Sequence, residues 1–210
     1  MSSSTPSDAT NPMAVSSDIG EPTTRLVQLS PVVVDAHVAP VRALVSEPLN
    51  AYRFRGLGPG SPERAVRAVL GDPLVLEQYL LADDAGRMLG LVQALTADFR
   101  HGTCQLGVVL STAAQRTGWP LKGAVLFIER IFHQYAFRKL YLEVNEFNQA
   151  PLARGLDRMF TREGTLLEYE WLEGAYRDVT FWSITREQFR DLPLRRLMLR
   201  AEGRSAAERE

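Results

Sequence analysis

The residues from Gln115 to Gly123 read QRTGWPLKG and combine the features of a phosphate-binding turn between a strand-like run and a long helix. Gly118 allows a tight turn and a close approach of the backbone. Arg116 and Lys122 add positive charge, and the start of a helix offers unpaired N–H groups at the positive end of its dipole. The segment therefore predicts a site for a phosphate or diphosphate, with an ordinary strand-to-helix connection as the alternative.

The segments around this turn must hold it in place. The helix that follows carries one apolar stripe, from Leu121 to Tyr135, with polar residues off it. Alternating runs over 24–30, 74–82, 88–97, 104–110 and 140–144 predict strands, and a hairpin turns near Glu173-Gly174. Helices are predicted over 34–45, from Ser61-Pro62-Glu63, and from 186 onward. In the first of these, Pro40 either kinks the helix or starts it. Strands with interspersed helices predict an α+β protein built on a mixed sheet.

Length and composition fit one domain with tails. The chain has 210 residues, a net charge of -1 and 45% hydrophobic residues. We predict a disordered tail over 1–23, a folded domain over 24–192, and a C-terminal helix and charged tail over 193–210. No long apolar run or basic excess points to a membrane or nucleic-acid partner. One cysteine, Cys104, suits a reducing, cytoplasmic setting, and the three histidines lack metal-ligand spacing, so no metal is expected.

The junction and the sequence after it resemble the GCN5-related N-acetyltransferase (GNAT) superfamily. The family's loop pattern, Gln/Arg-x-x-Gly-x-Gly/Ala, is matched by Gln115, Arg116, Thr117, Gly118 and Trp119, with Pro120 in the last slot. The run RKLYLEVNEFNQAP resembles the fifth strand and the asparagine that follows it, here Asn148. The ending resembles the ribosomal-protein N-acetyltransferase branch, a likeness carried by Phe160, Glu163, Gly164, Gly174, Tyr176, Asp178 and Arg186. The resemblance extends from about Thr24 to Phe189.

The resemblance implies a mixed, mostly antiparallel sheet with helices on both faces and splayed fourth and fifth strands that admit acetyl-CoA or another acyl-CoA. The cofactor contacts would be Val108, Val109, Leu110, Gln115, Arg116, Thr117, Gly118, Trp119, Lys122, Gly123 and Asn148. The connector between the first two helices would meet the acceptor through Tyr52, Phe54 and Arg55, with local packing as the alternative. The implied activity is direct transfer of the acyl group to a primary amine of a protein N-terminus or a small metabolite. A homodimer is one possible assembly.

Several positions depart from the family pattern. Pro120 removes a backbone donor from the phosphate loop, although proline suits the first turn of a helix. The slots that usually hold a tyrosine acid, a hydroxyl and a carboxylate base hold Gly155, Pro151 and Gln105. Glu143 and Asn148 are then the catalytic candidates, with Asp98 and His101 as further possible bases and Cys104 as a buried small hydrophobe. A degenerate protein that binds acyl-CoA without transferring the acyl group is the alternative function.

Overall fold

The computed structural model describes residues 27–51, 53–114, 119–148 and 157–199 of the chain. The tail predicted over 1–23, and residues 200–210 of the C-terminal helix and tail predicted over 193–210, therefore lie outside the described residues. The elements follow one another along the chain as β1 (Val27–Pro31), α1 (Val34–Val45), α2 (Glu63–Leu70), β2 (Val75–Asp83), β3 (Met88–Asp98), β4 (Thr103–Leu110), α3 (Trp119–Gln134), β5 (Lys139–Asn145), β6 (Thr161–Leu172), β7 (Ala175–Thr185) and α5 (Arg186–Asp191). A further helical segment covers 193–199.

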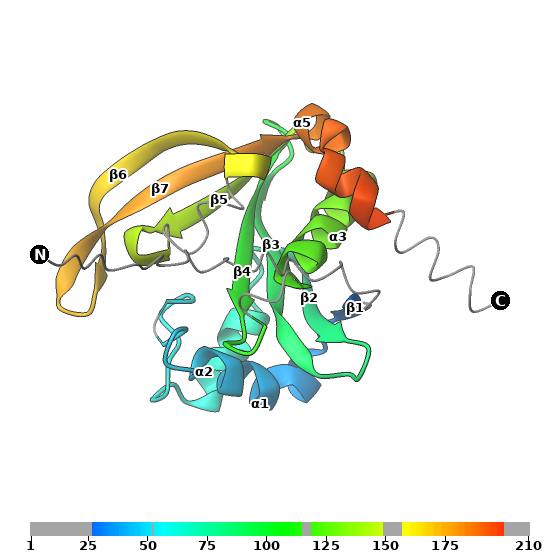
Figure 1. The fold of residues 1–210 in the computed structure, drawn as a ribbon. Coiled ribbons are helices and arrows are strands. Elements are labelled where there is room, and N and C mark those ends of the chain that lie inside the picture. Colours follow the sequence, from blue (N-terminus) through cyan, green and yellow to red (C-terminus); the bar gives the residue numbers. More distant parts are fainter. Residues whose placement is uncertain (1–26, 52, 115–118, 149–156, 200–210) are drawn as a thin grey trace, which may run out of the picture.

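The strands form one mixed sheet in the order β1-β2-β3-β4-β5-β7-β6. All neighbouring pairs are antiparallel except β4 and β5, which are parallel. Helix α3 covers one face, and α1 and α2 cover the other face of the β1–β4 half (Figure 1). The predicted α+β class and mostly antiparallel mixed sheet are thus confirmed.

Two hydrophobic cores hold the helices on the sheet. Leu81, Phe127 and Ile131 are fully buried in the core between the sheet and α3. Val66 and Leu91 are fully buried in the core beneath α1 and α2. Because neighbouring side chains of a strand point to opposite faces, the apolar central strands supply both cores at once. The β1–β4 half is therefore packed on both faces.

Three local predictions can be compared with the structure. The turn near Glu173-Gly174 is confirmed, with left-handed φ values of 54° and 79° at the two residues. Helix α1 runs through Pro40, so Pro40 does not start it. The single helix expected from residue 186 onward is wrong, because the helix breaks at Leu192, which has extended geometry. The residue before a proline disfavours the helical region, and Pro193 follows directly.

Candidate functional site

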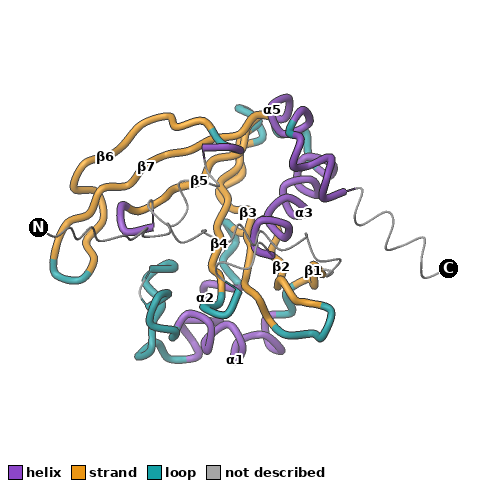
Figure 2. The backbone as a smooth tube through the Cα atoms, in the orientation of Figure 1, coloured by secondary structure: helices purple, strands orange, loops and turns teal. Residues whose placement is uncertain are grey.

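The strands β4 and β5 separate part-way along the sheet. Their parallel pairing runs only from Thr103–Lys139 to Leu106–Leu142. Beyond that point β4 stays paired with β3 as far as Leu110, and β5 stays paired with β7 as far as Asn145 (Figure 2). We call this divergence beyond Leu106–Leu142 the splay. It confirms the expected separation of the fourth and fifth strands.

The splay leaves backbone groups of β4 without a strand partner. Ser111 donates its N–H to the carbonyl of Leu89 on the β3 side, at 2.8 Å. Backbone groups alternate sides along an antiparallel strand, so Leu110 and Val108 direct theirs toward β5. Asn50 Nδ2 binds the carbonyl of Leu110 at 2.9 Å. Within the described part of the chain, the N–H and C=O of Val108 and the N–H of Leu110 keep no strand partner, so an extended ligand with amides can pair there.

Side-chain burial along β4 also changes where its pairing with β5 ends. Cys104 and Leu106 are buried in the core under α3. Val108 belongs to the same face by alternation, yet it is 37% exposed. The exposure begins where β5 leaves, so the α3 side of the splay is open at Val108.

The first turn of α3 stands at the end of this strand. The helix begins at Trp119, with no acidic residue in its first turn. Gly123 lets the helix approach the sheet closely, since a Cβ there would lie 2.9 Å from both terminal methyl carbons of Leu81. Gln115, Arg116, Thr117 and Gly118 lie outside the described residues, so their role at a phosphate stays a prediction. What the structure shows is a helix start without acids that follows the open strand.

The connector between α1 and α2 braces the end of β4, which the sequence analysis missed. Glu47 Oε2 accepts from the N–H of Thr112 at 2.6 Å and from its hydroxyl at 2.7 Å. Asn50 Nδ2 binds the carbonyls of Leu44 and Leu110. The contacts with Thr112 and Leu110 join positions 65 and 60 residues apart, and the only sequence signal was the polarity of Glu47 and Asn50. The brace fixes the chain just before the predicted phosphate loop.

The three predicted acceptor residues in this connector have different surroundings. Tyr52 lies outside the described residues. Phe54 is only 7% exposed and belongs to the core beneath α1 and α2, which favours the packing alternative for its side chain. Arg55 forms an ion pair with Asp72, whose pKa is lowered by the N–H of Leu74 and by Arg55. Neither Phe54 nor Arg55 is placed at the splay by a described contact.

Arg53, which the sequence analysis did not select, connects the two sides of the molecule. Its guanidinium carbon lies 4.4 Å from the ring centroid of Phe147, two residues after the end of β5. Its Nη2 lies 3.6 Å from Glu173 Oε1 at the turn between β6 and β7. Asn148 follows Phe147 in a helical turn over 146–148 and is partly buried. The connector and the segment with Asn148 are therefore neighbours.

Glu143 stands on β5 beyond the last pair with β4. It shares a face with Tyr141, and Tyr141 pairs with Gln105 across the ladder. Glu143 is exposed overall, yet partial desolvation of its carboxyl raises the pKa, and the charge of Glu170 raises it further. Glu170 in turn accepts from Asn145 Nδ2 at 2.5 Å. Glu143 makes no hydrogen bond or ion pair with any described residue, so its carboxylate is available to a ligand.

The other possible bases are less suited to act at the splay. Asp98 and His101 pair with each other at 2.6 Å in the turn before β4, at the end of the strand opposite the splay. Hydrogen bonds from His101 lower the pKa of Asp98, which makes it a weaker proton acceptor. Cys104 is 1% exposed, and burial raises the pKa of its thiol to about 11. Cys104 is thus a buried, protonated side chain in the core.

Two negative findings apply to the described ranges alone. No helix there is long and apolar enough to cross a membrane. No cluster of three or more His, Cys, Asp or Glu side chains in the same ranges could hold a metal ion.

Solved structures of N-acetyltransferases share this architecture. A spermidine N-acetyltransferase from Vibrio cholerae in complex with CoA and spermine superposes with a TM-score of 0.65 at 17% identity, covering 79% of this chain and 98% of that one. A GCN5-related N-acetyltransferase from Brucella melitensis gives 0.67 at 19% identity, covering 79% and 78%. A probable GNAT acetyltransferase from Chromobacterium violaceum gives 0.65 at 21% identity, covering 89% and 99%.

This chain has the GNAT fold. In sequence, it is 20% identical over 112 residues to the prophage-derived N-acetyltransferase YokL of Bacillus subtilis, which covers 53% of this chain and 63% of YokL. The match thus spans less than two thirds of that relative. No established family profile matches the chain.

Proposed function

We propose that this GNAT-fold chain is an acyl-CoA-dependent N-acyltransferase that moves acetyl from acetyl-CoA to a primary amine. The observation that carries the proposal is the splay, where Val108 and Leu110 present unpaired backbone groups just before the start of α3. Pantetheine amides would pair with this edge, and the diphosphate would lie at the first turn of α3. The CoA complex of the Vibrio cholerae relative supports this arrangement.

The proposed chemistry is a direct displacement at the thioester. The nitrogen of a neutral amine attacks the carbonyl carbon, the new C–N bond forms, and the C–S bond breaks. The proton lost by nitrogen finally resides on the CoA thiol. A raised pKa makes Glu143 a better proton acceptor than an ordinary carboxylate, so we assign it the role of base, with Asn148 orienting a reactant.

The acceptor is proposed from the charge beside Glu143. The charge of Glu170 reaches Glu143, and both carboxylates favour a cationic amine over an anionic one. The relative bound to spermine is consistent with a small polyamine-like metabolite. A protein N-terminus stays the second candidate, and the ribosomal-protein branch, cytoplasmic location and a homodimer stay predictions.

One observation favours a second function, binding without transfer. Gln105 occupies the strand position that often holds a carboxylate base, and its Oε1 accepts from the hydroxyl of Thr96 at 3.1 Å. An amide does not accept a proton at neutral pH. If Glu143 does not take over this role, the chain would bind acyl-CoA as a carrier or sensor.

Release of free thiol from acetyl-CoA separates the two functions. The panel of amines contains spermidine, L-lysine and a peptide with a free N-terminus. Turnover above background with any of them supports the enzyme, whereas tight acetyl-CoA binding with no release supports the binder. Gly118→Trp should abolish acetyl-CoA binding in calorimetry while thermal unfolding stays unchanged. Retained affinity in Gly118→Trp would contradict the assigned cofactor site.

A further inference from the structure

Gln93 on β3 is a polar side chain at the centre of the sheet. It is polar, yet its solvent exposure is 0%, and both neighbours in the strand, Val92 and Ala94, are apolar core residues. Its Oε1 is buried and has no hydrogen-bond partner in the described part of the chain. A buried acceptor left unpaired lowers stability, and most such groups in folded proteins have a partner. Gln93 therefore needs an explanation.

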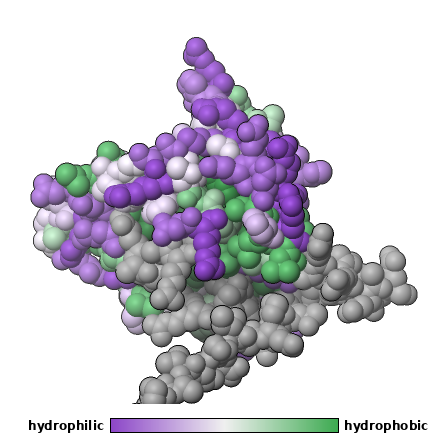
Figure 3. Space-filling view, turned by 45° about the horizontal axis from the view of Figure 1, so that its top comes forward, coloured by the Kyte–Doolittle hydropathy of each residue, from purple (hydrophilic) through white to green (hydrophobic). Residues whose placement is uncertain are grey.

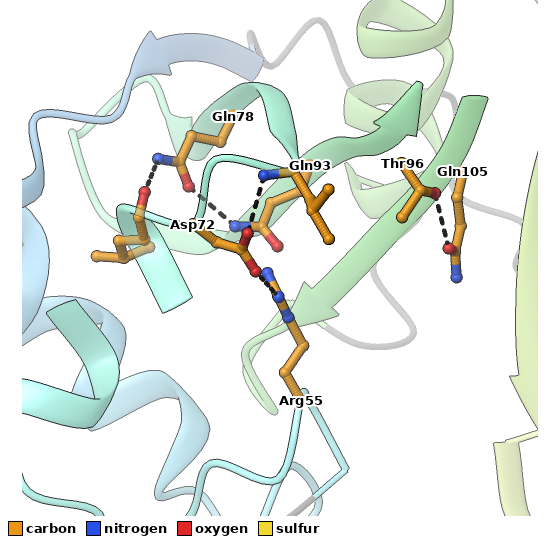
Figure 4. Close-up of polar contacts among 8 residues, drawn as sticks. Arg55, Asp72, Gln78, Gln93, Thr96 and Gln105 are labelled. Carbon is orange, nitrogen blue, oxygen red and sulfur yellow. Dashed lines mark hydrogen bonds and ion pairs between the residues drawn. The ribbon is translucent and has the colours of Figure 1, made fainter. Parts of the chain in front are cut away.

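The orientation of the Gln93 amide is fixed by a relay that ends on α2 (Figure 4). The carbonyl of Leu70 can only accept, and it receives Gln78 Nε2 at 2.6 Å. Gln78 Oε1 is then an acceptor, and it receives Gln93 Nε2 at 2.9 Å. Reversing Gln93 would place two oxygens against each other. The relay thus holds Oε1 as the unpaired end.

The unpaired oxygen lies beside the start of the splay. Gln93 pairs with Gly107 in the β3–β4 ladder, and Gly107 is the first residue of β4 beyond the pairing with β5. A Cβ added to Gly107 would lie 3.7 Å from Gln93 Oε1. Because Gly107 has no side chain, a small group resting on it would reach this oxygen. Val108, the next residue, directs its free N–H into the splay.

We propose that Gln93 is an acceptor-binding residue whose Oε1 receives an N–H of the amine that attacks the thioester. This inference rests on the proposed function and names the group that positions the nucleophile. An amide oxygen accepts one N–H without removing the proton, so the nitrogen lone pair stays free for the carbonyl carbon. Gln93 is on the α1 and α2 side of the sheet, since its relay ends on α2, so the amine enters from that side.

Two substitutions on different strands test the same oxygen. Gln93→Met keeps the length of the side chain and removes the acceptor, and partly exposed Gln78 can replace the lost bond with water. Gly107→Ala places a methyl group over the oxygen, where its closest contact would be the Leu95 side chain at 3.2 Å. Gly164→Ala on β6 is the matched control, because a Cβ there meets no atom within 4 Å.

Calorimetry on the CoA-loaded full chain gives the readout, with spermidine and L-lysine as the amine probes. We expect Gln93→Met and Gly107→Ala to weaken binding of at least one amine tenfold or more, while CoA affinity stays within twofold and Gly164→Ala matches the wild type. Gln78→Met, which frees the Gln93 amide to rotate, should weaken amine binding by a smaller factor. Thermal unfolding of each variant confirms that the fold persists.

Several outcomes would overturn the inference. Amine affinity equal to the wild type in both variants would show that the oxygen does not contact the amine. A parallel fall in CoA affinity would assign Gln93 to a pantetheine amide. The inference would also be rejected if the wild type bound neither probe. It would be rejected as well if a crystal structure of the amine complex still showed an internal water on Gln93 Oε1. Failure of the proposed function is separate, because it shows as absent acetyl-CoA binding or absent thiol release.

Discussion

The two halves of the sheet are packed to very different degrees. The β1–β4 half has a large core on each face, under α3 and under α1 and α2. In the β5–β7–β6 half, Leu140 and Ile184 join the core under α3, and the described residues form a small third cluster around Val144 and Trp182. Strand β6 exposes most of its side chains, among them Leu167, Tyr169 and Trp171. The splay therefore opens between β4, whose half is packed on both faces, and a half whose outer strand, β6, is largely exposed.

The β5–β7–β6 half, called the open half because β6 is exposed, adds polar contacts to its smaller apolar core. Lys139 binds Glu163 at 2.5 Å, and Arg177 binds Glu146 at 3.0 Å. Figure 3 shows this hairpin end, at the left, as mostly hydrophilic with scattered hydrophobic residues. Exposed ion pairs add little stability each. We infer that the packed half holds the cofactor edge in place, while the open half supplies charges suited to an acceptor.

The largest effect should come from removing a ring from the packed half. Phe127 is 1% exposed between α3 and the sheet, so Phe127→Ala should lower the free energy of unfolding by about 3–5 kcal/mol. Chemical denaturation measures the change. A loss below about 1 kcal/mol would show that the packed half is less tightly organised than its burial indicates.

The catalytic role of the open half depends on Glu143. Glu143→Gln should reduce turnover roughly a hundredfold without changing acetyl-CoA affinity. Because partial desolvation and Glu170 raise the pKa of Glu143, activity should fall as the pH drops through that raised pKa, and Glu170→Gln should move this fall to lower pH. A pH–rate profile of the wild type and Glu170→Gln measures the shift, and identical profiles would contradict the coupling.

The same pKa shift has a consequence for stability with a defined sign. The folded state binds the Glu143 proton more tightly than the unfolded state, so the favourable contribution is present at low pH and is lost as pH rises through the raised pKa. At neutral pH, Glu143→Gln should be as stable as the wild type or more stable. Melting temperatures of Glu143→Gln and the wild type at pH 4 and pH 7 test this comparison of stability.

Arg186 joins the two halves at the end of α3. Its Nε donates to the carbonyl of Phe137 at 2.9 Å, and its other nitrogens donate to the carbonyls of Phe132 and Tyr135. Arg186→Ala leaves three carbonyls without this donor and should lower the free energy of unfolding by about 2 kcal/mol. Arg186→Lys, which cannot bind all three, should recover only part of the loss in a denaturant titration. Full recovery would show that charge alone matters.

The smallest effect should come from the exposed strand. Leu167 is 75% exposed on β6, so Leu167→Ser should change the free energy of unfolding by less than about 0.5 kcal/mol. Chemical denaturation of Leu167→Ser and Phe127→Ala side by side compares the loss of unfolding free energy in the two halves. A loss above about 1 kcal/mol would mean that Leu167 is buried in solution, for example against another chain.

The fold could be predicted from sequence because its signals are local and periodic. Alternation placed β2, β3 and β4 within a residue or two, and the apolar stripe placed α3. The splay came from the family resemblance and the strand order was not predicted, since both depend on pairing between residues far apart in the chain. The break at Leu192 was missed even though Pro193 signalled it.

The site was less predictable because polar contacts leave weak patterns in a sequence. The relay from Leu70 through Gln78 to Gln93 joins three elements, and none of its residues has a distinctive spacing. One signal was present, a glutamine inside each of two mainly apolar runs, LVLEQYLLA and GLVQALTA. Burial of Phe54 was equally hidden, because an aromatic residue in a loop can pack or bind.

Strand β6 has a further consequence for how the chain behaves at high concentration. Its outer edge pairs with no strand of the described ranges. Three residues, Leu167 to Tyr169, stand opposite Asp178 alone, and the N–H of Glu168 binds Asp178 at 2.8 Å. An irregular edge pairs poorly with a second strand, which protects against aggregation. Asp178→Ala should therefore increase light scattering of concentrated samples before it measurably changes the melting temperature.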